Sequence, residues 1–167
     1  TWNAITQDGS ASSLDFDGVN DYAVASHDGK LILTNSFVIL CRFKPKNLTG
    51  SMDYLFGKLN GAGSDNNWSV VWEYTNNAVT IYCGGYTGSN PMTGTAITLA
   101  DTNWHAIAYK YDGTEYSRFL DGTKSVISAS ISFSFASGGT GNLVFGSFNG
   151  ASNHCSCCLD DVIIYKD

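Results

Sequence analysis

Basic residues are scarce in this sequence, and their scarcity excludes one large class of partner. The chain has nine Lys and Arg against fifteen Asp and Glu, which gives a formal net charge of −6 at pH 7. A nucleic-acid-binding surface needs a basic stripe that displaces counterions from the phosphates. The composition therefore argues against nucleic acid as a partner and, for the same reason, against anionic membranes.

Long apolar runs are also missing. No stretch approaches the roughly 18–20 apolar residues that a membrane-spanning helix requires. The first residues, TWNAITQDGSASS, contain no basic segment followed by an apolar one, so no signal peptide is visible. We therefore expect no membrane insertion.

Proline and helical periodicity are rare, and short β-type segments take their place. Only Pro45 and Pro91 occur, against 18 Gly. About a dozen short strands, of which 36–44 alternates most clearly, are separated by Gly, Asn, Asp and Ser turns at a spacing of roughly 8–12 residues. This pattern predicts an all-β fold, an antiparallel jelly-roll β-sandwich of two sheets, formed by a single domain over residues 1–167.

The clearest local signal is a hairpin within residues 103–124. A strand at 104–111 is followed by Asp112-Gly113, a second strand at 116–120 and another turn at Asp121-Gly122. Alternation places Ile107 and Tyr109 on one face with His105 and Tyr111, and we expect that face to lie in the core. No partner for His105 is visible in the sequence, so we interpret it as structural.

The five cysteines allow at most two disulfides. Cys41 and Cys83 are in phase with apolar residues of their strands, which predicts buried thiols. His154-Cys155-Ser156-Cys157-Cys158 offers soft metal ligands in a short loop but lacks the paired CxxC spacing of a zinc site. Partly buried thiols or one disulfide are therefore favoured there over zinc.

Four sequence blocks together resemble one family. These are LDFDGVNDYAV at 14–24, SFVILCRFKP at 36–45, NWHAIAYKYDG…FLDG at 103–122 and LDDVIIYKD at 159–167. Their order resembles that of laminin-G-like domains in the concanavalin A-like lectin/glucanase superfamily, with a pentraxin-related pattern. The resemblance implies two packed antiparallel sheets with the first and last strands adjacent. It does not fix a ligand, because one fold hosts many functions.

Glutamate is too scarce for the glucanase chemistry known on this fold. Retaining glycosidases need two carboxyl groups about 5–5.5 Å apart. The chain has only Glu73 and Glu115, in separate segments, and no strand of the Glu-x-Asp-x-Glu type. We therefore expect no enzymatic activity and no catalytic residue.

The resemblance also suggests a calcium site in two polar loops. Asp65, Asn66 and Asn153 are the metal ligands it implies, since calcium prefers oxygen donors. The alternative is that these residues are ordinary turn formers. Asp17, Asp21, Asp160 and Asp161 form a second set, for which turn and strand-pinning roles are favoured.

A ligand site is expected on the long polar loops at 59–67, 84–94 and 148–155, because loops on a rigid sandwich commonly carry recognition. Tyr86 would stack on a sugar ring, while Asp65, Asn66 and Asn149 would bind hydroxyl groups. Stacking and neutral hydrogen bonds would give binding of low charge dependence. Trp68 and Trp72, by contrast, are expected in the core.

These observations favour a non-catalytic recognition module that binds glycans, located outside the cell or on a virion surface. The alternative is a structural, decoration or adhesion protein on a virion or other assembly, which fits the low charge and the free cysteines. A glycoside hydrolase ranks third. The expected partner is a glycan or a cell-surface or virion protein, and a homo-oligomer is compatible with either reading.

Overall fold

The computed structural model describes residues 2–3, 13–33, 36–49, 52–59, 68–73, 77–83, 97–128 and 140–166. Within these residues the structure is built almost entirely of strands, and the only helical element is a single 3-10 turn, Gly29–Leu31. The all-β prediction is confirmed. None of the described helical segments is long and apolar enough to span a membrane.

The strands, in chain order, are β1 Trp2–Asn3, β2 Ser13–Asp17, β3 Ala23–Ala25, β4 Phe37–Pro45, β5 Met52–Leu59, β6 Trp68–Glu73, β7 Ala78–Cys83, β8 Ile97–Thr98, β9 His105–Tyr111, β10 Tyr116–Leu120, β11 Thr123–Ser128, β12 Asn142–Phe145 and β13 Ser156–Lys166.

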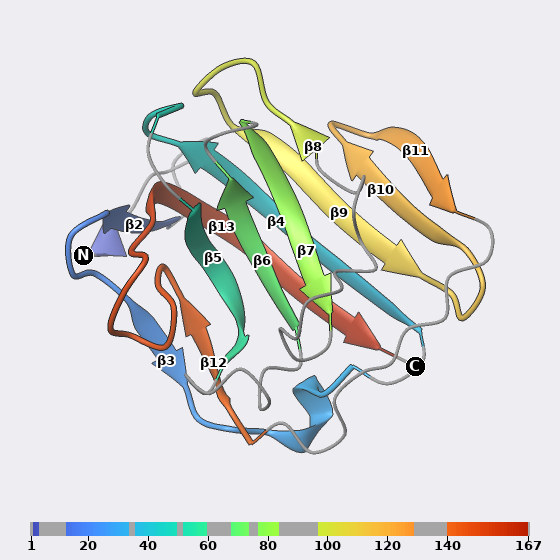
Figure 1. Cartoon of the computed structure of the whole chain (residues 1–167), viewed down its shortest axis with the longest axis horizontal. Coiled ribbons are helices and arrows are strands. Elements are labelled where there is room, and N and C mark those ends of the chain that lie inside the picture. The colour runs from blue at the N-terminus through green and yellow to red at the C-terminus, as the bar shows by residue number, and fades with distance from the viewer. Residues whose placement is uncertain are drawn as a thin grey trace.

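They form two antiparallel sheets that face each other (Figure 1). The first sheet has the order β1-β2-β13-β4-β9-β10-β11, and the second has the order β3-β12-β5-β6-β7-β8. β13, close to the end of the chain, pairs with β2 near its beginning. With the two-residue β1 on the outer side of β2, the N-terminal and C-terminal strands lie together, as the family resemblance implied.

Strict alternation along β4 and β9 creates the core. On β4 the inward side chains are Phe37, Ile39, Cys41 and Phe43, all at most 2% exposed. On β9 the inward residues include Ile107 and Tyr109, each 1% exposed, as the sequence predicted. The second sheet contributes Trp68 and Trp72, also 1% exposed, so their assignment to the core is confirmed.

Burial governs the ionisation of two core groups. Desolvation raises the pKa of Cys41 to about 12, which keeps its thiol protonated. Lys58 is fully buried, and its Nζ contacts the carbonyl oxygen of Gly141 at 2.6 Å and His27 Nδ1 at 2.7 Å. Desolvation lowers the pKa of Lys58. These bonds tie β5 to the chain segments beside β3 and β12.

The last strand is longer than expected. The sequence places Cys155, Cys157 and Cys158 in one loop, but β13 begins at Ser156, so Cys157 and Cys158 are strand residues. Cys157 is paired with Phe16 on one side and Pro45 on the other. Pairing with β2 and β4 on both sides extends the strand into this segment, whose own sequence has no alternating pattern. For Cys83, only the backbone lies within the described part of the chain.

We predict that Ile107→Ala destabilises the fold by about 2–5 kcal/mol, because it leaves a cavity between the two sheets. Chemical denaturation followed by tryptophan fluorescence measures this change. Lys110→Ala on the opposite face of β9 is the matched control, with an expected effect within about 0.5 kcal/mol. Equal effects of the two substitutions would contradict the assignment of the faces.

Candidate functional site

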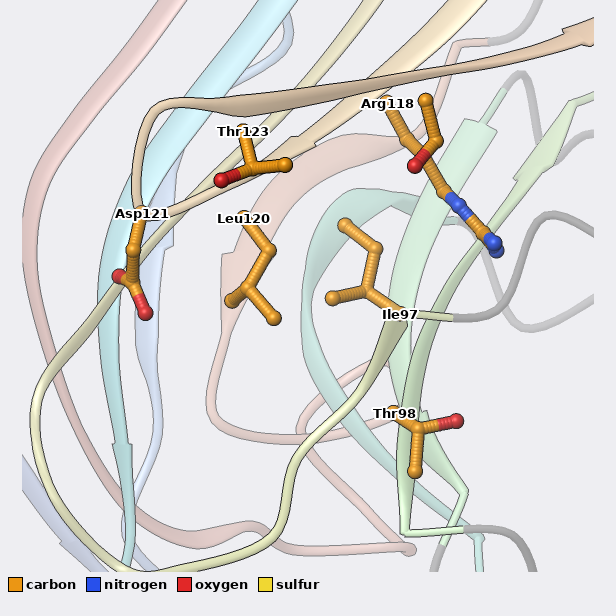
Figure 2. Close-up of a pocket in the computed structure, with 7 residues that line it drawn as sticks. Ile97, Thr98, Arg118, Leu120, Asp121 and Thr123 are labelled. Atoms are coloured by element: carbon orange, nitrogen blue, oxygen red, sulfur yellow. The ribbon is translucent and has the colours of Figure 1, made fainter.

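A cleft of about 480 Å³ opens between the edges of the two sheets, where β8 faces β10 and β11 (Figure 2). We call it the edge cleft. Its lining residues are Ile97, Thr98, Arg118, Leu120, Asp121, Thr123 and Ser125. Clefts of this size accommodate small organic ligands in many proteins.

The position of the edge cleft follows from a hydrogen bond between the sheets. The buried Tyr109 hydroxyl donates to the carbonyl oxygen of Val79 at 2.7 Å and so joins β9 to β7. One strand outward on each sheet, Arg118 pairs with Tyr109 and Ile97 pairs with Val79. Arg118 and Ile97 therefore flank the place where the sheets separate beyond this bond.

The β10–β11 turn holds one end of the edge cleft in place. Asp121 and Gly122 have φ angles of +49° and +81°, which are typical of a type I′ hairpin turn. Asp121 Oδ1 accepts a hydrogen bond from the Ala106 amide at 2.8 Å. This contact fixes the carboxylate between the turn and the start of β9.

His105 adds a second constraint on Asp121. Its Nδ1 lies 2.9 Å from Asp121 Oδ2, and its Nε2 lies 3.2 Å from Asp101 Oδ1. Both ring nitrogens can donate to these carboxylates only when both carry a proton. The His105 hydrogen bond, followed by the Ala106 amide, lowers the pKa of Asp121, so the Asp121 carboxylate is ionised at neutral pH. The sequence showed no partner for His105, and the structure supplies two, Asp121 and Asp101, in a role that supports the β10–β11 turn.

The lining combines two kinds of surface. Ile97 and Leu120 provide apolar contact area between the sheets, and Figure 2 shows their side chains approaching each other. Around them, Thr98, Thr123 and Ser125 offer hydroxyl groups that both donate and accept hydrogen bonds. Arg118 brings a guanidinium group and Asp121 a carboxylate. The edge cleft can therefore contact a ligand that has both apolar faces and many hydroxyl groups.

The loop residues proposed from the sequence fall into two groups. Asp65, Asn66 and Tyr86 lie outside the described residues. Asn149 is described and has a φ of +49° next to Gly150 in the turn closed by the Ala151 amide and the Phe148 carbonyl oxygen. The Asn153 side-chain amide donates to the Met52 carbonyl oxygen at 2.8 Å. Both asparagines thus have structural roles, and their ligand roles remain predictions.

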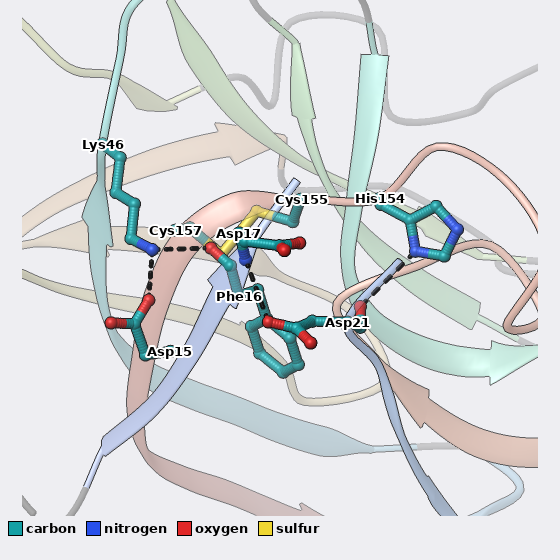
Figure 3. The surroundings of a disulfide bond; sticks show 8 residues. All are labelled: Asp15, Phe16, Asp17, Asp21, Lys46, His154, Cys155 and Cys157. Carbon is teal, nitrogen blue, oxygen red and sulfur yellow. Dashed lines mark hydrogen bonds and ion pairs between the residues drawn. A yellow bond between two sulfur atoms is a disulfide. The ribbon is translucent and has the colours of Figure 1, made fainter. Parts of the chain in front are cut away.

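A disulfide joins Cys155 and Cys157 at the base of this loop (Figure 3). Both residues are fully buried, while Cys158 keeps a free buried thiol. The expectation of one disulfide in this segment is confirmed. Nearby, His154 Nδ1 lies 3.4 Å from the Asp21 carbonyl oxygen, and Lys46 Nζ donates to the Phe16 carbonyl oxygen at 2.8 Å. The first contact connects the segment before the disulfide to the β2–β3 connection, and the second joins the end of β4 to β2.

Among the described residues there is no group of three or more His, Cys, Asp or Glu side chains suited to a metal ion. Asp17 Oδ1 accepts from the Val19 amide at 2.8 Å, as a turn residue does. Asp160 and Asp161 instead face Arg42 on the outward side of the first sheet, at 3.6 and 4.0 Å. The structure therefore gives this second aspartate set turn and strand-pinning roles.

The residues of the edge cleft were not singled out as a site in the sequence. Arg118 and Leu120 looked like ordinary residues of a hairpin strand. The register of the predicted hairpin pairs Arg118 with Tyr109 on the same side of the sheet. That pairing could have indicated that Arg118 points between the sheets. The partner sheet edge, β8, has only two residues and gives little signal of its own.

The chain belongs to the family described as the concanavalin A-like lectin/glucanases superfamily, whose laminin G-type model matches residues 17–167. The family suggested by the four sequence blocks is thus confirmed. A comparison with curated protein sequences finds no significant match.

Solved structures of low sequence identity share this fold. Domain 4 of AbnA, an extracellular arabinanase from Geobacillus stearothermophilus, is 14% identical with a TM-score of 0.65, over 99% of this chain and 74% of that one. The binding domain of Paraclostridial Mosquitocidal Protein 1 is 11% identical with a TM-score of 0.68, over 99% and 42%. Trypanosoma rangeli sialidase is 13% identical with a TM-score of 0.61, over 98% of this chain but only 26% of the sialidase.

We predict that His105→Phe raises the pKa of Asp121 towards its ordinary value of 3.8, because the largest cause of the lowering is removed. A carboxylate with a lowered folded pKa stabilises the fold above its ordinary pKa, and this contribution is lost as the pH falls through the lowered value. Titration of the carboxyl carbons by NMR measures the shift. The internal control is Asp112, whose pKa of about 2 depends on Glu115 and Thr114 and should not move. An unchanged Asp121 titration would contradict the prediction.

Proposed function

We propose that this protein is a non-catalytic glycan-binding module and that the edge cleft is its binding site. The observation that carries the proposal is the lining of the cleft, which combines Ile97 and Leu120 with three hydroxyl groups, one carboxylate and one guanidinium group. A sugar presents C–H faces and hydroxyl groups close together. Such a surface matches it better than a purely apolar or a purely charged cleft does.

The named relatives support this proposal. Domain 4 of AbnA was solved in complex with arabinotriose, and the mosquitocidal protein structure is that of its binding domain. At this level of identity they share a fold with the present chain, and the function does not follow from the fold. Their contribution is to make a saccharide the first ligand to test.

The environments of both glutamates support a non-catalytic role. Glu115 Oε1 accepts from Lys124 Nζ at 2.7 Å and from Ser117 Oγ at 2.8 Å, and the Lys124 bond is the largest cause of its lowered pKa. A general acid needs the opposite shift. Glu73 belongs to β6 in the second sheet, where its Oε1 accepts from the Tyr82 hydroxyl. Glu115 lies in the β9–β10 turn of the first sheet, so the two carboxylates do not come from one strand.

The proposed setting is extracellular or a virion surface. The Cys155–Cys157 disulfide supports it, because disulfides persist in oxidising environments. Binding in the edge cleft uses Arg118 and Asp121 directly and requires no calcium. The calcium site suggested for Asp65, Asn66 and Asn153 would act separately, and adding a chelator to the binding assay tests it.

A structural or adhesion role is a second candidate, and one surface favours it. On the outward face of the first sheet, Ile163 and Tyr165 are 54% and 62% exposed. They pair across the sheet with Leu40 and Val38, so the four side chains form one apolar stripe. Exposed apolar patches often mark contacts between proteins. The second candidate would be supported if the protein bound no glycan on a broad array but self-associated through this stripe.

We predict that the wild-type protein binds a subset of glycans on a broad array and that Ser125→Trp abolishes this binding by filling the edge cleft. Lys124→Trp places the same side chain on the opposite face of the same strand and should leave binding unchanged. Circular dichroism of both variants controls for folding. Loss of binding in both variants, or in neither, would remove the edge cleft as the site.

A further inference from the structure

We propose that the edge cleft selects acidic oligosaccharides and that Arg118 binds the carboxylate of a uronic or sialic acid residue. This inference rests on the proposed glycan-binding function and adds the chemical class of the ligand. Among the described residues that line the cleft, Arg118 is the one basic side chain. Guanidinium groups bind carboxylates through two parallel hydrogen bonds, which gives geometric selectivity as well as affinity.

The position of Arg118 makes its charge effective. The residue is half-buried at the mouth between the sheets, beside Ile97, as Figure 2 shows. Arg118 pairs across β10 and β9 with the buried Tyr109, on the same side of the sheet, so its charge lies close to the low-dielectric core. Hydrogen bonds to a charge in such a position are screened by solvent less than those at an open surface.

The two ends of the edge cleft carry opposite charges. Asp121 stands at the other end of the β10 segment, three residues from Arg118, which is a distance of about 10 Å along a strand. Asp121 is held by the Ala106 amide and by His105, so its negative charge stays in place. A carboxylate on the ligand is attracted at the Arg118 end and repelled at the Asp121 end. The ligand therefore binds in one direction, with hydroxyl groups of a neutral neighbouring sugar on Asp121.

The charge balance favours a single carboxylate over a highly sulfated chain. The protein carries a net charge of −6, which opposes the approach of a dense polyanion. One guanidinium group in the lining can neutralise one acidic group per binding site. Binding should weaken with added salt, which differs from the low charge dependence expected from the sequence.

Titration calorimetry at about 0.15 M salt with paired probes tests this proposal. The pairs are oligogalacturonate against its methyl ester and sialyllactose against lactose, and a sulfated oligosaccharide is the third arm. At least one acidic probe should bind more tightly than its neutral partner, by about ten- to a hundredfold, which is the range expected for hydrogen bonds to a charged group. Arg118→Gln should remove this preference, and Arg118→Lys should restore it only in part.

Lys110→Gln is the matched control, since it removes one positive charge from the opposite face of the adjacent strand. It should leave the preference intact. If neutral glycans bind as tightly as acidic ones, or if Arg118→Gln and Lys110→Gln act alike, the acidic specificity is wrong while glycan binding stands. Tighter binding of the sulfated probe also contradicts it. If no probe and no array glycan binds, the proposed function itself fails. The wild-type comparison needs no variant, so it decides the question even if Arg118→Gln does not fold.

Discussion

The edge of the sandwich where the candidate site lies is organised around one hydrogen bond between the sheets, from the Tyr109 hydroxyl to the Val79 carbonyl oxygen. Burial raises the pKa of Tyr109 well above its ordinary value, so the phenol remains protonated and continues to donate. The Tyr109 ring also stacks on Tyr116, with 6.2 Å between the ring centroids. The hydrogen bond ties β9 of one sheet to β7 of the other, and the stacking joins β9 to its neighbour β10, close to the edge where the sheets separate.

The candidate site is a consequence of this arrangement. A strand order that ends in β8 on one sheet and in β10–β11 on the other leaves two edges facing each other. Sheet twist makes such edges diverge, and short edge strands leave the gap open. The rigid core then positions Arg118 and Ile97, while the I′ turn and His105 position Asp121. Arg118 and Asp121 are thus held in place by a strand and a tight turn. Fixed polar groups of this kind favour specific recognition of a ligand.

Some of this could be predicted from the sequence because it depends on local patterns. Period-2 alternation placed Ile107, Tyr109 and Cys41 in the core, and the DG step at Asp121-Gly122 marked the turn correctly. The four sequence blocks identified the family. Each of these inferences uses residues close together in the chain, whose side-chain directions follow directly from strand geometry.

The site could not be predicted in the same way because its parts meet only in the folded sandwich. Arg118 lines the edge cleft only because β8, a two-residue strand about twenty residues earlier in the chain, lies opposite it. His105 meets Asp121, sixteen residues away, through hairpin register and turn geometry. The extra length of β13 also depends on pairing with β2 and β4, since its own sequence from Ser156 to Cys158 has no clear strand pattern. Long-range pairing, rather than local propensity, decided each of these features.

The most direct test of the central claim is an NMR titration of the labelled protein with a glycan that binds in the array experiment. Binding in the edge cleft predicts that the largest amide shifts fall on Thr98, Leu120 and Thr123, on both sides of the gap between the sheets. Shifts confined to the loop around Asn149 and Asn153, with the β8, β10 and β11 amides unmoved, would contradict it.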